Sequence, residues 1–226
     1  MSYSQLRHWV KANVLGGQIT NYHPDFVSKL NQVEKLSTDV QQLIKSMRDV
    51  VDPNLRWPFN PAKLANPELD ESLRFAQHLR ALGDACRNDQ VKQYLQLVAN
   101  VEEEINVAIK LFLRQVETYT FEPLNKFVKE DAVLVRQEKK NLDKMRADYD
   151  NACDYLRNSH EGNIDQKNAN LDKCKENFEK QADLMQSLLD KLPEYEKTIA
   201  DASKQFLKAD RQLRASIGTA LKKIKN

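Results

Sequence analysis

The sequence predicts an all-α protein built from three long, kinked, antiparallel helices. Only 5 glycines and 7 prolines interrupt its 226 residues, and charged residues make up 30% of the chain. This composition is typical of long helices. Apolar residues also recur every three or four positions over stretches much longer than a globular domain requires. Together these observations favour an elongated coiled-coil architecture over a compact one.

The first long helix is predicted over residues 25–52, with Asp25 near its N-cap and Pro53 after its end. An insertion at 53–67 follows, and it contains four prolines together with Trp57 and Phe59. We expect this insertion to be ordered but not helical, with its aromatic side chains packed on the helices. A further helical piece then extends to about residue 86.

The second helix is predicted over residues 89–158 and the third over 164–225, with a turn between them. At 1.5 Å per residue the second helix would be roughly 100 Å long. Pro123 and Pro193 lie inside these helices. Because proline removes one backbone hydrogen bond and crowds the preceding turn, we expect a kink at each position.

Residues 1–22 are predicted to form a separate N-terminal segment, and residues 23–226 a single domain. If the segment is helical, it places a tryptophan on an apolar side and cations on a polar side, a combination that suits a membrane interface. The residues expected to insert are Leu6, Trp9, Val10 and Lys11. The alternative is an arm that docks on its own domain or is disordered.

The middle of the second helix is apolar on nearly every side, and this predicts a homodimer. A helix that is apolar all round must be covered all round, and a second copy related by twofold symmetry would provide that cover. The residues expected in the dimer core are Ile105, Ala108, Ile109 and Phe112. The alternative is that this stretch packs on the 53–67 insertion of its own chain.

Several functional classes are disfavoured by the sequence. No apolar run is long enough to span a bilayer, and no secretory signal is evident. The three widely spaced cysteines favour a reducing compartment, so we expect a soluble, cytoplasmic protein. We find no catalytic constellation, metal site or cofactor motif. Because basic residues alternate with acidic ones around a net charge of +2, nucleic-acid binding is also disfavoured.

Cations concentrate in the second half of the second helix. Arg136, Lys140 and Lys144 recur every four residues and therefore share one helix face. Glu138 and Asp143 are available for pairs at helical spacing. On charge alone, the sequence favours a solvated surface rather than a binding site.

The stretch from 121 to 152 changes this interpretation because it resembles the central helix of endophilin- and amphiphysin-type BAR domains. The matching motifs are Pro-Leu at 123–124, Lys-Lys-Asn-Leu at 139–142 and Arg-Ala-Asp-Tyr-Asp at 146–150. Weaker similarities are Val-Val-Asp-Pro-Asn at 50–54 and Leu-Pro at 192–193. The resemblance extends over the chain from about residue 25, with the helices in the expected order.

The resemblance implies a crescent-shaped homodimer with a central six-helix bundle that binds anionic phospholipid membranes and senses or generates curvature. An inserting N-terminal amphipathic helix, a place that residues 3–14 could fill, would make it an N-BAR protein. Such a protein is peripheral to the membrane and active in endocytosis or membrane trafficking. Lys140 and Lys144 fall where the family carries concave-face cations, and Lys167 falls in its basic tip. The membrane-binding residues expected are Arg136, Lys139, Lys140, Lys144, Arg146 and Lys167.

The tip departs from the family pattern. Residues 157–167 contain two fixed positive charges, two negative charges and a histidine, so tip contacts with lipid should be weak. The alternative function is a dimeric coiled-coil interaction protein, such as a small-GTPase effector or a cytoskeletal tether, without a direct role at lipid. Partner capture that does not depend on lipid would favour this alternative.

Overall fold

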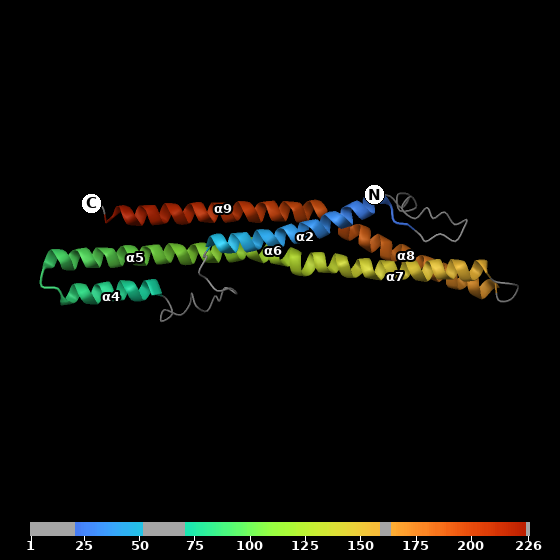
Figure 1. Ribbon diagram of the computed structural model, residues 1–226, viewed down its shortest axis with the longest axis horizontal. Coiled ribbons are helices and arrows are strands. Elements are labelled where there is room, and N and C mark those ends of the chain that lie inside the picture. The colour runs from blue at the N-terminus through green and yellow to red at the C-terminus, as the bar shows by residue number, and fades with distance from the viewer. Residues whose placement is uncertain (1–20, 52–70, 159–163, 225–226) are drawn as a thin grey trace. The chain divides into compact units, whose positions relative to one another are not determined.

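The computed structural model describes residues 21–51, 71–158 and 164–224, and within these ranges all regular secondary structure is helical (Figure 1). The segments are α2 (Pro24–Val51), α4 (Glu71–Ala85), α5 (Asp89–Val116), η2 (Glu117–Phe121), α6 (Glu122–Lys126), η3 (Phe127–Asp131), α7 (Ala132–Arg157), α8 (Ile164–Leu189) and α9 (Leu192–Lys222). The prediction of an all-α protein with long, kinked helices is confirmed.

The chain divides into two compact units. Unit 1 comprises Met1–Gln42 and Asn125–Thr198, and unit 2 comprises Leu43–Leu124 and Ile199–Asn226. Three helices, α2, α6 and α9, contribute residues to both units. Each unit therefore builds its core from parts of the chain that are far apart in sequence.

In unit 1, α7 and α8 form an antiparallel hairpin (Figure 1). The rings of Tyr149 and Phe178 stack across the hairpin, with centroids 6.0 Å apart and planes 7° apart. The first part of α2 packs against the same helices, because Phe26 and Val33 are fully buried. The other fully buried large side chains of unit 1 are Phe127, Val135, Leu142, Phe178, Met185 and Leu189.

In unit 2, α4 folds back along α5 (Figure 1). The two helices are in contact at Gly83, where a Cβ would lie 3.4 Å from the carbonyl oxygen of Lys92, at van der Waals distance. Helix α9 supplies Phe206, whose ring centroid lies 6.4 Å from that of Phe112. The Arg80 guanidinium joins α4 to α5 by pairing with Glu103 at 2.6 Å.

The start of α2 differs from the expected N-cap. The helix begins at Pro24, so Asp25 lies inside its first turn. The backbone N–H of Asp25 donates to Nδ1 of His23 at 3.2 Å. The His23 ring therefore supplies the acceptor that we expected from the carboxylate of Asp25. Proline suits the first helical position because no N–H is needed there.

The kink expected at Pro123 takes the form of two π-helical segments, η2 and η3, on either side of α6. The N–H of Glu122 donates to the oxygen of Glu117, and the N–H of Ala132 donates to that of Phe127. Both bonds span five residues instead of four. A proline that removes one hydrogen bond and crowds its own preceding turn accounts for η2.

The kink expected at Pro193 is a break just before this residue. Helix α8 ends at Leu189 and α9 begins at Leu192. The carbonyl oxygen of Lys191 accepts the N–H groups of Glu194 and Tyr195, at 2.9 and 3.1 Å. Pro193 thus lies in the first turn of a new helix, where its missing N–H costs nothing.

Three predictions concern residues outside the described ranges. These are the N-terminal segment with Leu6, Trp9, Val10 and Lys11, the insertion at 53–67, and most of the turn between the second and third helices.

Candidate membrane interface

Lys140 and Lys144 are exposed side chains of α7, and neither has an ion-pair partner among the described residues. They are four residues apart in a continuous α-helix, so they project from the same face. Exposed cations without internal partners keep their full charge available to an anionic surface. Both side chains are therefore accessible to an anion from outside the chain.

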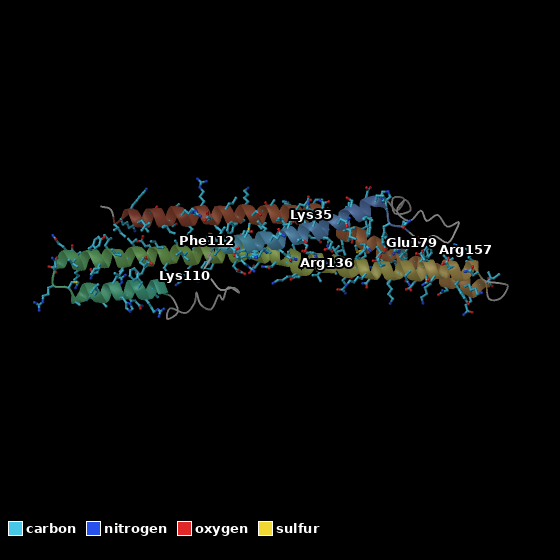
Figure 2. The ribbon with its side chains drawn as sticks, in the orientation of Figure 1. Lys35, Lys110, Phe112, Arg136, Arg157 and Glu179 are labelled. Atoms are coloured by element: carbon cyan, nitrogen blue, oxygen red, sulfur yellow. The ribbon has the colours of Figure 1, made fainter. Side chains whose placement is uncertain are left out.

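Arg136, labelled in Figure 2, is held inside unit 1 instead. Its Nε donates to both carboxylate oxygens of Glu34, at 2.9 and 2.8 Å, and its Nη2 donates to the hydroxyl of Ser37 at 3.0 Å. Ser37 is fully buried on α2. Arg136 thus ties α7 to α2, and its charge is already neutralised by Glu34.

Lys139 and Arg146 converge on Asp143 and Tyr22. Lys139 Nζ donates to Oδ2 of Asp143 at 2.5 Å, and the Arg146 guanidinium lies 3.8 Å from Oδ1. The Tyr22 hydroxyl donates to the same Oδ1 at 2.7 Å. The Tyr22 ring centroid is 4.8 Å from Lys139 Nζ and 4.6 Å from Arg146 Cζ. We call these four residues the Asp143 cluster.

The cluster shifts the titration of its acid groups in opposite directions. Burial raises the pKa of Tyr22, and the hydrogen bond to the Asp143 carboxylate raises it further. Burial would also raise the pKa of Asp143, but the hydrogen bonds from Lys139 and Tyr22 outweigh this and lower it. The carboxylate is therefore ionised and the phenol neutral at neutral pH, and these forms favour the contacts of Asp143 with Lys139, Arg146 and Tyr22.

Lys167 lies at the far end of the α7–α8 hairpin. Its Nζ is 4.9 Å from the ring centroid of Tyr155. Arg157 (Figure 2) pairs with Asp154 at 3.1 Å. Arg157 and Lys167 therefore both have partners in their own chain.

Unit 2 exposes apolar side chains on α5. Val107 is 67% exposed and Leu111 is 56% exposed, whereas Phe112 is only 5% exposed because Phe206 covers it. Three of the residues expected in a dimer core, Ile105, Ala108 and Ile109, are half-buried. Among the described residues, the chain covers one side of the apolar stretch by itself and leaves Val107 and Leu111 exposed.

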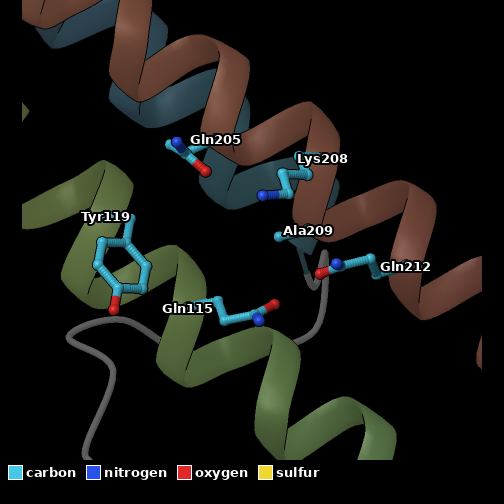
Figure 3. A pocket seen from close by; sticks show the side chains of 6 residues that line it. All are labelled: Gln115, Tyr119, Gln205, Lys208, Ala209 and Gln212. Carbon is cyan, nitrogen blue, oxygen red and sulfur yellow. The ribbon is translucent and has the colours of Figure 1, made fainter.

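A cavity of about 300 Å³ lies within unit 2, between the α5–η2 stretch and α9 (Figure 3). Its lining residues are Gln115, Tyr119, Gln205, Lys208, Ala209 and Gln212. Gln115 and Tyr119 follow Leu111 at intervals of four, so the cavity continues the open α5 face. Its lining is polar, and Lys208 supplies its one cation.

The described residues contain no group of three or more histidine, cysteine or carboxylate side chains able to hold a metal ion. Likewise, none of the helices in the described ranges is long and apolar enough to cross a membrane.

Sequence reasoning missed Tyr22, Ser37 and the central role of Asp143. Tyr22 lies in the predicted N-terminal segment, yet its hydroxyl donates to a carboxylate 121 residues away. Periodicity reports which face a residue occupies but not which distant side chain it meets. The sequence indicates Asp143 only as a partner at helical spacing, which is how Lys139 contacts it.

Comparison with protein families gives one result: the BAR domain family model matches residues 2–226. No curated protein matches the sequence significantly. The match covers nearly the whole chain, so the assignment does not depend on one short motif.

Proposed function

The chain belongs to the BAR-domain family, whose members are non-catalytic modules that dimerise and bind membranes, and we propose that it engages anionic lipid through α7. Lys140 and Lys144 are the residues that carry this proposal. Both are exposed and have no ion-pair partner among the described residues. Each basic residue near an anionic surface contributes about 1 kcal/mol, and a dimer presents every cation twice.

Lipid contact by the other predicted cations is weaker in this proposal. Arg136 is bound to Glu34, and Lys167 lies against the Tyr155 ring. Lys126 and Lys129 are exposed on α6 and η3, one to two turns before α7. They extend the set of cations on the same long helix towards Pro123.

For the finer assignment, we propose an N-BAR protein of the endophilin and amphiphysin type that acts at cytoplasmic membranes in endocytosis or trafficking. The motif resemblance at 123–124, 139–142 and 146–150 supports this. The insertion of Leu6, Trp9, Val10 and Lys11 remains part of the proposal. Small-GTPase or cytoskeletal partners are the alternative, and the same experiment tests them.

We propose that, in the homodimer, the second copy of the chain covers the exposed apolar side of α5. Val107 and Leu111 would lie at its centre, beside Ile105, Ala108 and Ile109, and Phe112 would support this surface from inside its own unit. Burial of large exposed apolar side chains favours association. The cavity at Gln115 and Tyr119 would lie at the edge of this interface.

The test is co-sedimentation with phosphatidylserine-containing vesicles, comparing the wild type with the double variant Lys140→Glu and Lys144→Glu. We expect the apparent affinity to fall at least about tenfold, since 1.4 kcal/mol corresponds to a factor of ten. Wild-type binding should also weaken at high salt, because screening shortens the reach of exposed charges.

The matched control is Lys173→Glu with Lys175→Glu, which makes the same charge change at exposed lysines of α8. Equal losses in both double variants would mean that net charge, not the α7 face, determines binding. A wild-type chain that ignores anionic vesicles at low salt but captures a protein partner would support the alternative function.

A further inference from the structure

The Asp143 cluster brings two cations of the candidate interface, Lys139 and Arg146, close to the carboxylate of Asp143. Lys139 contacts Oδ2, while Tyr22 and Arg146 approach Oδ1. The Tyr22 ring lies beside both cations, under 5 Å from each, and it contacts the Phe26 ring at 5.1 Å. The arrangement is a small anion site with a carboxylate already in it.

Accessibility within the cluster is uneven. The side chains of Lys139 and Arg146 are 22% and 24% exposed, whereas that of Asp143 is 40% exposed. The internal anion is therefore the part that faces solvent most. An external anion approaching this surface would meet Asp143 before it reached either cation.

Lysine and arginine bind phosphate and carboxylate groups by the same charge-assisted hydrogen bonds. In the cluster, Lys139 donates a hydrogen bond to Asp143, and a guanidinium nitrogen of Arg146 forms an ion pair with it at 3.8 Å. We propose that Lys139 and Arg146 form a subsite for the phosphate of an anionic lipid headgroup, and that Asp143, latched by the Tyr22 hydroxyl, is an internal competitor which the headgroup displaces. This inference rests on the proposed function and adds Tyr22 and Asp143 to it.

Two consequences follow from this competition. Lys140 and Lys144 bind first, because nothing in the described chain competes for them. Lys139 and Arg146 join only where the local density of headgroup charge is high enough to replace Asp143. Binding therefore rises more steeply with anionic lipid content than a fixed set of cations would give.

The decisive variant is Asp143→Asn, which removes the negative charge of Asp143 from the subsite and keeps the side-chain shape. Its control is Asp148→Asn, the same charge change on an exposed residue of the same helix. Both are compared with the wild type on vesicles of increasing phosphatidylserine content in phosphatidylcholine. We expect Asp143→Asn to gain about three- to tenfold more affinity than the control, and to flatten the dependence on anionic lipid.

A second variant, Tyr22→Phe, keeps the ring against both cations but removes the hydroxyl latch. We expect a smaller gain than that of Asp143→Asn, with unchanged helicity by circular dichroism. This variant makes no charge change, so a gain here cannot come from net charge. If Asp143→Asn proves unstable, Tyr22→Phe alone decides: a gain supports the latch, and wild-type affinity overturns it.

The outcomes separate this inference from the proposed function. A wild type that fails to bind anionic vesicles contradicts the proposed function itself. A wild type that binds while Asp143→Asn merely equals Asp148→Asn overturns the subsite alone. Titration with inorganic phosphate, without vesicles, identifies the source of the ligand: if the two variants differ only there, the site takes free phosphate, and the lipid assignment is wrong.

Discussion

The two units differ in what they leave on their surfaces. Of the sixteen exposed large hydrophobic side chains among the described residues, ten belong to unit 2 and six to unit 1. The cations of α7 all belong to unit 1. Exposed apolar side chains are thus more numerous in unit 2, where we propose contact with a second copy, and the α7 cations that we propose bind lipid lie in unit 1.

The units also use charged residues differently. In unit 1, Arg136, Lys139 and Arg146 are bound to carboxylates or to an aromatic ring, whereas Lys140 and Lys144 are exposed. Some cations of α7, the helix that carries the candidate interface, therefore form contacts within unit 1. A count of basic residues overstates what this surface can offer to a membrane.

The largest expected effect tests the exposed apolar side chains of α5 in unit 2. Val107→Asp with Leu111→Asp should convert the dimer to a monomer. Each substitution removes about 1.5–3 kcal/mol of stabilisation from burying an apolar side chain in the interface. It also places a charge where the dimer would bury it. Sedimentation equilibrium measures the change. Because a dimer presents its cations twice, binding to anionic vesicles should weaken as well.

Its control is Leu184→Asp, an exposed apolar position of similar kind in unit 1. We expect this variant to remain dimeric. Dissociation of both variants to the same extent would break the comparison, since the apolar surface of unit 2 would then have no special role.

Much of the fold was predictable because apolar residues recur every three or four positions along each long helix. The first helix, expected over 25–52, is observed as α2 over Pro24–Val51. The kinks were placed near the correct prolines, but their form was not predicted. Whether a proline is absorbed by a π-helical segment, as before Pro123, or by a break, as before Pro193, depends on what packs against the helix.

The candidate site was only half predictable. Sequence identified the α7 cations, but it could not separate Lys140 and Lys144 from Lys139 and Arg146. The difference arises from Asp143, which pairs with both Lys139 and Arg146, and from Tyr22, which reaches α7 from a distant part of the chain. In the same way, the pattern marked Phe112 as apolar without showing that Phe206 of its own chain covers it.

A smaller effect tests the structural role of a cation in unit 1. Arg136→Ala should lower the free energy of unfolding by about 1–3 kcal/mol, because it leaves the fully buried Ser37 hydroxyl without this donor and Glu34 without its partner. Chemical denaturation measures this loss. Affinity for anionic vesicles should change much less than in the Lys140→Glu and Lys144→Glu variant. The reverse pattern would assign Arg136 to the membrane surface.

The smallest expected effect compares two carboxylates of unit 1 whose pKa values move in opposite directions. Burial raises the pKa of Asp131, against the opposing charge of Lys126, so its ionised form destabilises the fold at neutral pH. Asp131→Asn should therefore raise the melting temperature slightly at pH 7, and this gain should vanish as the pH falls through the raised pKa towards 3.8 and below.

The pKa of Asp143 is lowered, with bonds from Lys139 and Tyr22 outweighing burial, so its contribution is stabilising above the ordinary value of 3.8 and is lost as the pH falls through the lowered pKa. Asp143→Asn should consequently lower the melting temperature at pH 7, while the same variant strengthens vesicle binding. A melting temperature that rises in both variants would mean that burying the Asp143 carboxylate destabilises the fold more than its hydrogen bonds stabilise it. The proposed role of the Tyr22 hydroxyl in holding Asp143 would then have no support.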